Sequence, residues 1–263
     1  MLTQQIAGSV TDAGRKRSQQ QPMSLDQPSR RAFLAGSVVT VGAGGAYYLT
    51  GSDETAHDIS PSLHSSDETS ALGIDLARKP IVGSPDAPLE LYYWTDFQCP
   101  FCEQFERETF PDLVRKYVET GDVRVVVITI PYFGADSMTA AVASKCVWEQ
   151  VRDDEPSAYW DWHAAVFEQQ GEKNSGWASA ENLLKYTRSV SGVDADALEP
   201  CLADRRSELE SEINADVDRA RSIGVTGTPT FVVFDPETET AGSLVGAQPL
   251  ERFDEAIDRI EDA

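Results

Sequence analysis

The chain has 263 residues, with 44 acidic and 22 basic side chains and a formal net charge of −22 at pH 7. Only six of the basic residues are lysines, so arginine supplies most of the positive charge. Such a chain is a poor partner for nucleic acid, because phosphate contacts need clustered Lys and Arg. The length accommodates one domain together with additional segments.

The first 50 residues contain two segments of different character. Residues 1–28 are rich in Gln, Ser and Gly, have no apolar periodicity, and are predicted to be disordered. In residues 29–50, Arg30 and Arg31 precede a Phe-Leu pair and a weakly apolar run of Gly and Ala. This order resembles a twin-arginine (Tat) export signal and predicts an extracytoplasmic protein, secreted or anchored at the outer face of the cell membrane. The run is also about long enough to span a bilayer, so a cleaved signal and a retained N-terminal membrane anchor both stay open.

Residues 51–78 are acidic, rich in Ser and Thr, and without periodicity, which predicts a flexible linker. His57 and His64 lie in this linker, and no metal role is expected for them. The folded domain is predicted to begin near Lys79 and to cover residues 79–263.

The start of this domain has the pattern of a βαβ unit. Leu89–Thr95 is predicted to be a strand, followed by a helix from Cys99 to about Thr120 that Pro111 should kink. Val123–Ile130 is a β-branched run, typical of a strand that is buried on both faces and is therefore parallel to the first.

A long helical block, about residues 137–223, comes next. Its predicted helices are Ser137–Val151, Ser157–Gln169, Ala180–Val190 and about Asp204–Ile223. An aromatic cluster in this block is expected to form its core, and His163 within the cluster is expected to be structural, since a single histidine lacks partners for catalysis. A strand ending at Phe234, a strand near Ser243–Val245 and a final amphipathic helix, Leu250–Ile260, complete the domain.

Two cysteines, Cys99 and Cys102, stand at C-x-x-C spacing between the first predicted strand and the helix that follows it. Sulfurs at this spacing in the first turn of a helix can close a small disulfide ring. Unpaired N–H groups and the positive end of the helix dipole favour a thiolate at Cys99. Pro100 fits because the first turn of a helix tolerates a residue without an N–H. The pattern predicts a redox dithiol in which Cys102 is the resolving thiol.

The other two cysteines, Cys146 and Cys201, lie far apart in the helical block. In an exported protein with an even number of cysteines they are predicted to form a structural disulfide, with two buried free thiols as the alternative. A zinc or iron–sulfur site built from all four cysteines is disfavoured, because metal ligands usually come in closely spaced pairs. No metal is therefore expected.

A second motif accompanies the dithiol: residues 227–231, Gly-Thr-Pro-Thr-Phe, form a turn that leads into a strand. Together with residues 96–102, Asp-Phe-Gln-Cys-Pro-Phe-Cys, it resembles the DsbA-like branch of the thioredoxin superfamily, over about Lys79 to Ile260. The resemblance implies an α/β thioredoxin fold with an inserted helical subdomain, and no cofactor beyond the redox-active disulfide. It also implies that Pro229 is cis and packs against the dithiol, and that the backbone of Thr228 docks the substrate. The resemblance further implies that Pro100, Phe101 and Asp96 support the site.

One position departs from this family. Its members commonly keep a buried acid six residues before the first cysteine, where it assists proton movement during exchange, and this chain has Tyr93 there. Glu90 is expected on the other face of the strand, because side chains alternate. Asp96 is nearer, but capping of the loop into the helix explains it equally well. The sequence therefore identifies no proton-transfer acid.

These features predict an exported thiol–disulfide oxidoreductase that exchanges disulfides with protein substrates through Cys99 and Cys102, with oxidation as the favoured direction. A disulfide reductase or isomerase, and a thioredoxin-fold module that binds peptides without exchange, are the alternatives. An oxidant needs a recycling partner, expected to be a quinone-linked oxidase in the membrane. The acidic, lysine-poor composition resembles that of extreme halophiles and suggests a haloarchaeal protein.

Overall fold

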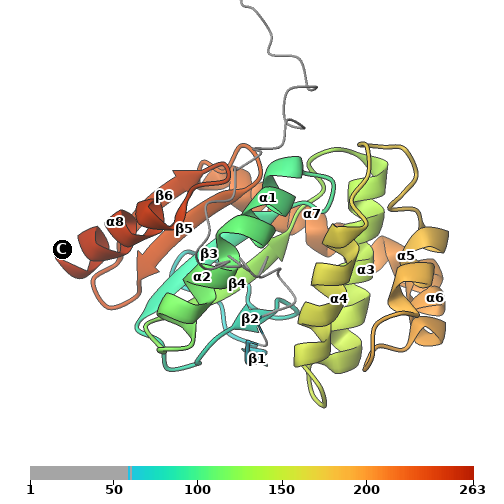
Figure 1. Ribbon diagram of the computed structural model, residues 1–263, viewed down its shortest axis with the longest axis horizontal. Coiled ribbons are helices and arrows are strands. Elements are labelled where there is room, and N and C mark those ends of the chain that lie inside the picture. The colour runs from blue at the N-terminus through green and yellow to red at the C-terminus, as the bar shows by residue number, and fades with distance from the viewer. Residues whose placement is uncertain (1–58, 60) are drawn as a thin grey trace, which may run out of the picture. The chain divides into compact units, whose positions relative to one another are not determined.

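The computed structural model describes residue 59 and residues 61–263, and the structural statements below concern these residues (Figure 1). Their strands form one mixed sheet with the order β1-β2-β4-β3-β5-β6. The strands are β1 (Leu63–His64), β2 (Ile81–Val82), β3 (Leu89–Thr95), β4 (Val123–Thr129), β5 (Thr230–Asp235) and β6 (Thr240–Val245). β3 and β4 pair in parallel, and the other neighbours pair antiparallel. The βαβ unit that the sequence predicts is therefore present.

Apolar cores lie on both faces of the sheet, so every residue of β3 is buried. Because side chains alternate along a strand, Tyr93 belongs to the core on one face and Tyr92 to the core on the other. The pairing register places Val127 of β4 and Phe231 of β5 on either side of Tyr93. This register determines which side chains of β3 lie under the helix that carries the cysteines.

The helix that the sequence predicts from Cys99 to about Thr120 is interrupted rather than kinked. α1 covers Pro100–Glu108, α2 covers Phe110–Leu113, and a π-helical segment covers Val114–Val118. The break falls at Thr109, whose φ of −122° lies outside the helical range. Pro111 cannot donate an N–H inside a helix, but it fits the first turn of a new one, so the chain starts α2 around it. The Thr109 hydroxyl donates to the carbonyl oxygen of Gln248 at 3.0 Å and holds the break in place.

The inserted block consists of α3 (Ala135–Val151), α4 (Ser157–Glu168), α5 (Ala180–Thr187), α6 (Ala195–Asp204) and α7 (Arg206–Ser222). Figure 1 shows α3 to α6 grouped at one side of the sheet, while α7 leads back toward it. The sequence prediction missed α6 and began the following helix two residues early. Pro200 inside α6 obscured the pattern. The Asp194 carboxylate, which accepts hydrogen bonds from the amides of Asp196 and Ala197 at 2.9 and 3.3 Å, was the available signal of an N-cap.

The predicted linker, residues 51–78, is structured from residue 61 onward. β1 pairs with β2, and a single bridge joins Thr69 to Asp75. Ile74 and Leu76 are 3% and 1% exposed and pack in the core that contains Tyr92. Isolated apolar residues among polar ones produce no periodicity, so the expected boundary at Lys79 is wrong. The predicted disordered segment, the predicted export signal and linker residues 51–58 and 60 lie outside the described residues.

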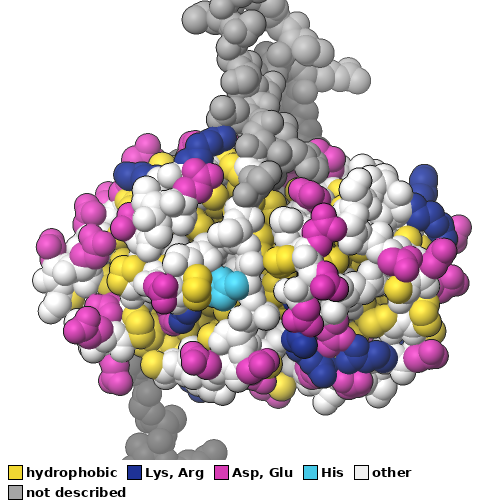
Figure 2. All heavy atoms as spheres, turned by 90° about the horizontal axis from the view of Figure 1, so that it is seen from below, with side chains coloured by type: hydrophobic (Ala, Val, Ile, Leu, Met, Phe, Trp, Pro, Cys, Tyr) yellow, Lys and Arg dark blue, Asp and Glu magenta, His cyan; other side chains and the backbone are white. Residues whose placement is uncertain are grey.

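The C-terminal elements follow the prediction, although β6 begins at Thr240 rather than near Ser243. α8 covers Leu250–Glu261, and its Phe253 ring packs against Phe231 with the ring centres 5.0 Å apart. Figure 2 shows Asp and Glu side chains spread over the face that it draws, with Lys and Arg gathered at a few places. Within the described part of the chain, no helix combines the length and the apolar character needed to cross a membrane.

Candidate active site at the start of helix α1

The start of α1 places the C-x-x-C pair directly beyond the carboxyl end of β3. β3 ends at Thr95, Cys99 precedes the first helical residue, Pro100, and Cys102 lies inside the first turn. The amides of Cys102 and Glu103 donate to the carbonyl oxygen of Cys99 at 3.0 and 3.1 Å, which closes this turn. Both sulfurs are free thiols, and both cysteines are buried.

The two thiols differ in acidity because their surroundings differ. A hydrogen bond from the Cys102 thiol has the largest effect on Cys99. Burial opposes this effect. The Thr228 side chain and the amides of Phe101 and Cys102 add weaker hydrogen bonds, and the net result is a pKa of Cys99 lowered to about 6. Burial is the main reason that the pKa of Cys102 is raised well above its ordinary value. Near neutral pH the reduced pair therefore holds a thiolate on Cys99 and a proton on Cys102.

The loop before β5 brings Thr228 and Pro229 against the dithiol. The Thr228–Pro229 peptide bond is cis. As a thiol, Cys99 donates a hydrogen bond from Sγ to the carbonyl oxygen of Thr228 at 3.2 Å. The amide of Gly246 donates to the carbonyl oxygen of Pro229 at 2.9 Å, which ties the loop to the end of β6. The backbone of Thr228 thus lies directly beside the Cys99 sulfur, where an extended peptide can pair with it.

Exposed aromatic side chains flank the dithiol. Phe101, between the two cysteines, and Tyr132, in the loop after β4, are 58% and 54% exposed. Tyr132 lines a hollow of about 340 Å³, here called the Tyr132 hollow, together with Ile130, Val225 and Gly227. An exposed apolar surface next to a thiolate is suited to contact with unfolded protein segments.

Asp96 connects two loops at the carboxyl edge of the sheet. Its Oδ1 accepts a hydrogen bond from the amide of Gln98 at 2.8 Å, and its Oδ2 accepts from the amides of Tyr132 and Phe133 at 2.7 and 3.1 Å. Burial raises the pKa of Asp96. The carboxylate caps loop amides and not the helix itself, since α1 has no side-chain cap.

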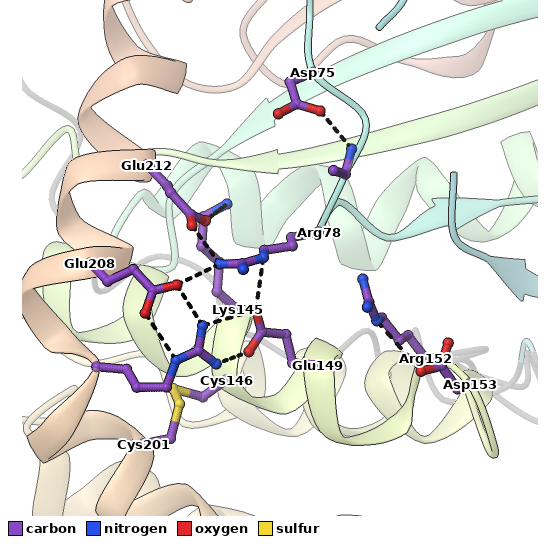
Figure 3. A network of polar contacts seen from close by, with 12 residues as sticks. Asp75, Arg78, Lys145, Cys146, Glu149, Arg152, Asp153, Cys201, Glu208 and Glu212 are labelled. Carbon is purple, nitrogen blue, oxygen red and sulfur yellow. Dashed lines mark hydrogen bonds and ion pairs between the residues drawn. A yellow bond between two sulfur atoms is a disulfide. The ribbon is translucent and has the colours of Figure 1, made fainter. Parts of the chain in front are cut away.

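The other two cysteines, Cys146 and Cys201, are joined in a disulfide that connects α3 to α6. Their Cα atoms are 6.1 Å apart. Ion pairs from Glu149 to Arg78 and Arg205 lie beside this bond (Figure 3). Because the sulfurs of Cys146 and Cys201 are bonded to each other, they cannot also be thiolate ligands of a metal site built from all four cysteines. The described residues also contain no cluster of three or more metal-ligating side chains.

Two groups close to the dithiol were not indicated by the sequence. The side-chain amide of Gln170 donates to the carbonyl oxygens of Phe97 and Cys99 at 2.6 and 3.1 Å, and no local pattern marks this loop residue. Glu106 is buried on α1 with one carboxylate oxygen 2.9 Å from Nε2 of His163. His163, expected to be structural, is thus the partner of a buried acid. Glu106 lies four residues after Cys102 and therefore on the same face of α1, and this spacing is the signal that could have marked it.

Helices inserted between the βαβ half and the cis-proline strand distinguish DsbA-like proteins from thioredoxin, and this chain has that arrangement. This arrangement, together with the dithiol at the start of α1, places the chain in the class of DsbA-like protein disulfide oxidoreductases. A family model described as Thioredoxin matches residues 76–259, and the chain belongs to this family.

A relative and two solved structures illustrate the similarity. The chain is 27% identical over 157 residues to disulfide bond formation protein D of Bacillus subtilis (strain 168). The matched region covers 60% of this chain and 68% of the relative. The crystal structure of oxidised BdbD from Bacillus subtilis has a TM-score of 0.62 at 22% identity, over 76% of this chain and 100% of that one. DsbA from Chlamydia trachomatis has a TM-score of 0.58 at 24% identity, over 69% of this chain and 91% of that one. The expected α/β thioredoxin fold with inserted helices is confirmed.

Proposed function

We propose that this chain is an exported thiol–disulfide oxidoreductase that oxidises protein substrates through the Cys99–Cys102 pair. The observation that carries the proposal is the asymmetry of the pair, with a thiolate favoured at Cys99 beside the Thr228 backbone and a buried thiol at Cys102. The name of the relative, disulfide bond formation protein D, supports the same activity. The dithiol is the redox group, and we propose no further cofactor.

The exchange proceeds through a mixed disulfide on Cys99. A substrate thiolate attacks the Cys99 sulfur of the oxidised enzyme, the Cys99–Cys102 bond breaks, and Cys102 leaves as a thiolate that takes up a proton. A second substrate thiolate attacks the substrate sulfur of the mixed disulfide and releases Cys99 as a thiolate. Two substrate thiols thereby become one disulfide, one of their protons goes to Cys102 and the other to solvent, and the enzyme receives the two electrons.

The lowered pKa of Cys99 supports oxidation as the direction. A sulfur that is stable as a thiolate is a good leaving group from the mixed disulfide, and stabilising the reduced pair makes its disulfide a stronger oxidant. The reduced pair must then pass its electrons on. A membrane-bound, quinone-linked redox partner that re-oxidises Cys99 and Cys102 is part of the proposal.

Thr228 and Pro229, with the aromatic side chains around them, provide the docking surface for substrates. An extended segment that pairs with the backbone of Thr228 brings its cysteine to Cys99. Apolar neighbours of that cysteine then contact Phe101 or enter the Tyr132 hollow. This surface selects unfolded chains, because folded proteins rarely expose apolar side chains next to a cysteine.

Export by the twin-arginine route rests on residues 29–50, with the signal either cleaved or retained as an anchor. Disulfides persist mainly outside the cytoplasm, and the Cys146–Cys201 bond suits that location. The net charge of −22 suits a haloarchaeal protein that stays soluble in high salt. Replacing Arg30 and Arg31 with Lys should leave the protein in the cytoplasm, and unchanged export would contradict this part of the proposal.

Oxidative refolding of a reduced, unfolded secreted protein tests the activity. In high salt, the oxidised wild-type protein should restore the target's disulfides, and Cys99→Ser should not. The double variant Cys146→Ala with Cys201→Ala should act like the wild type. Binding of the target without any thiol consumption would contradict the proposal and indicate a peptide-binding module. Reduction of the target's disulfides without any oxidation would indicate a reductase.

A further inference from the structure

A buried polar cluster lies beneath the dithiol. It consists of Tyr93, Thr95, Glu106 and His163, none of which is more than 3% exposed. Tyr93 and Thr95 point to the same face of β3 because they are two residues apart. Glu106 is four residues after Cys102 on α1, so these two side chains leave the same face of that helix. This set is called the Glu106 cluster below.

Most polar atoms of the Glu106 cluster lack hydrogen-bond partners. Nε2 of His163 and Oε1 of Glu106 are 2.9 Å apart. By contrast, Oε2 of Glu106, Nδ1 of His163 and the hydroxyls of Tyr93 and Thr95 have no partner of normal geometry. Unpaired buried polar groups destabilise a fold, and native proteins contain few of them. Their concentration at one place indicates a use other than stability.

The two hydroxyls connect Glu106 to the dithiol. The Cys102 thiol lies beside the hydroxyl of Thr95. The Tyr93 hydroxyl lies close to both Thr95 and Glu106 and is influenced by the charge of Cys102. Burial, followed by the charges of Glu106 and Cys102, raises the pKa of Tyr93 well above its ordinary value. The phenol therefore stays protonated, so it can relay a proton but cannot serve as the base.

Other buried carboxylates near β3 are already paired. Glu90 points to the opposite face, where Tyr92 and Arg124 bind its two oxygens. The oxygens of Asp96 accept three backbone amides. Among the described residues, Oε2 of Glu106 is the one buried carboxylate oxygen without a partner. It lies close to the hydroxyl of Tyr93, the residue that occupies the family position of the buried acid.

We propose that Glu106 is the base that receives the proton of Cys102 when the dithiol closes its disulfide, acting through the hydroxyls of Thr95 and Tyr93. This inference rests on the proposed function, since it concerns the same dithiol. In the mixed disulfide between Cys99 and an oxidising partner, the proton of Cys102 passes to Thr95, that of Thr95 to Tyr93, and that of Tyr93 to Glu106. The Cys102 thiolate attacks the Cys99 sulfur, and the partner's sulfur leaves as a thiolate. In the reverse direction, the departing Cys102 thiolate regains its proton by the same route.

The titratable groups that face Glu106 come from three elements. β3 contributes Tyr93, α1 contributes Cys102, and α4 contributes His163 and Tyr159. Among the described residues, His163 is the one side chain in a hydrogen bond of normal geometry with Glu106, and its contact with one carboxylate oxygen leaves the other for Tyr93. The Tyr159 hydroxyl is paired with a serine of α3 at 2.8 Å and lies off the route. Neither Glu106 nor His163 touches the sulfur. Glu106 acts through the hydroxyls of Tyr93 and Thr95, and His163 acts through Glu106, so both are positioning residues.

Stopped-flow reaction of the reduced protein with the aromatic disulfide dithiobis(nitrobenzoate) separates the two steps. One thionitrobenzoate is released when Cys99 attacks, and a second when Cys102 resolves the mixed disulfide. Glu106→Gln keeps the shape and a hydrogen-bonding oxygen but no longer acts as a base. It should leave the first step unchanged and slow the second at least about tenfold at neutral pH, because general bases contribute that much or more. The rate of the second step should then rise steeply with pH, since hydroxide must replace the carboxylate.

Variants on both faces of β3 separate a proton route from a general structural effect. Tyr93→Phe keeps the ring and should slow the second step in the same way. Tyr92→Phe and Glu90→Gln are matched controls on the opposite face and should change neither step. A wild-type rate and pH profile of the second step in Glu106→Gln would overturn the inference, and so would equal slowing of both steps or the same slowing in Glu90→Gln. A wild-type protein without the first step would contradict the proposed function and this inference with it.

Discussion

The two cysteine pairs of this protein show how placement determines what the same residue does. Cys99 and Cys102 lie in one helical turn, as free thiols, where a hydrogen bond and backbone amides favour a thiolate on the first sulfur. Cys146 and Cys201 are 55 residues apart in the sequence and join two helices in a disulfide. One pair is a local feature of α1, and the other fixes the arrangement of the inserted block.

The two disulfides differ in what opposes or favours their breaking. Closing a ring of a few residues restricts the unfolded chain little, so the Cys99–Cys102 bond is controlled mainly by how well the reduced thiolate is stabilised. Closing a loop of 55 residues restricts the unfolded chain strongly, so breaking the Cys146–Cys201 bond mainly weakens the fold. We therefore expect the first pair to be reactive, because its reduced form is stabilised, and the second pair to be structural, because its bond restricts the unfolded chain.

Removing a sulfur of the first pair should have the largest effect. Cys99→Ser should lower disulfide exchange by at least about a thousandfold, because the nucleophile is lost. Cys102→Ser should still react once and then accumulate a mixed disulfide on Cys99, detectable by mass spectrometry of the intact protein. Rapid turnover of Cys102→Ser without any trapped adduct would show that Cys102 is not the resolving thiol.

Removing the second pair should affect stability and leave exchange unchanged. The double variant Cys146→Ala with Cys201→Ala should lose about 4 kcal/mol of unfolding free energy, from the loop-closure entropy of a 55-residue separation. Urea unfolding in high salt measures this loss. The rate of exchange at Cys99 provides the comparison. An unchanged unfolding midpoint with impaired exchange would mean that the two pairs do not have separate roles.

The pH dependence of Cys99 should show a moderate effect. With a pKa of about 6, its alkylation by iodoacetamide should slow about tenfold between pH 7 and pH 5, following the thiolate fraction. Cys102→Ala removes the hydrogen bond with the largest effect and should move this profile to higher pH. An ordinary thiol profile in the wild type would contradict the asymmetry of the pair.

The same pKa shift predicts how stability depends on pH. Because the pKa of Cys99 is lower in the folded than in the unfolded chain, the thiolate stabilises the reduced protein above the ordinary thiol pKa. This contribution is lost as the pH falls through about 6. The oxidised protein has no such thiolate, so the stability difference between the two forms should change over this range. Parallel pH curves for the two forms would contradict the prediction.

The smallest effect is expected at the docking surface. Tyr132→Ala should weaken the binding of an unfolded peptide about threefold to tenfold, because it removes part of an apolar contact of the Tyr132 hollow. The maximal exchange rate should stay the same, since Tyr132 is not a redox residue. An isothermal titration with a cysteine-free peptide measures the affinity. A loss of maximal rate at unchanged affinity would place Tyr132 in the exchange step instead.

Features encoded in short stretches were predictable from the sequence. The β-branched and aromatic runs of β3 and β4, the C-x-x-C pair and the Gly-Thr-Pro turn each depend on neighbours in the chain. The resemblance that these two motifs carry implied the α/β thioredoxin fold, and Thr228 does lie beside Cys99 in the structure.

Features that arise from packing between distant segments were not predictable. Glu106 meets His163 only because α1 and α4 are adjacent, although the two residues are 57 positions apart. Ile74 and Leu76 contribute to a core without any periodic pattern around them, so the sequence predicts a linker over residues 51–78 although residues 61–78 are structured. The helix α6 was hidden by Pro200, a residue that usually interrupts helices.

The reduction potential of the Cys99–Cys102 pair tests the central claim most directly. It is measured by equilibration with glutathione in high salt, with the Cys146–Cys201 disulfide intact. A stabilised thiolate on Cys99 predicts a value closer to the potential of DsbA, about −120 mV, than to that of thioredoxin. A value near the potential of thioredoxin, about −270 mV, would contradict the account and identify the pair as a reductant.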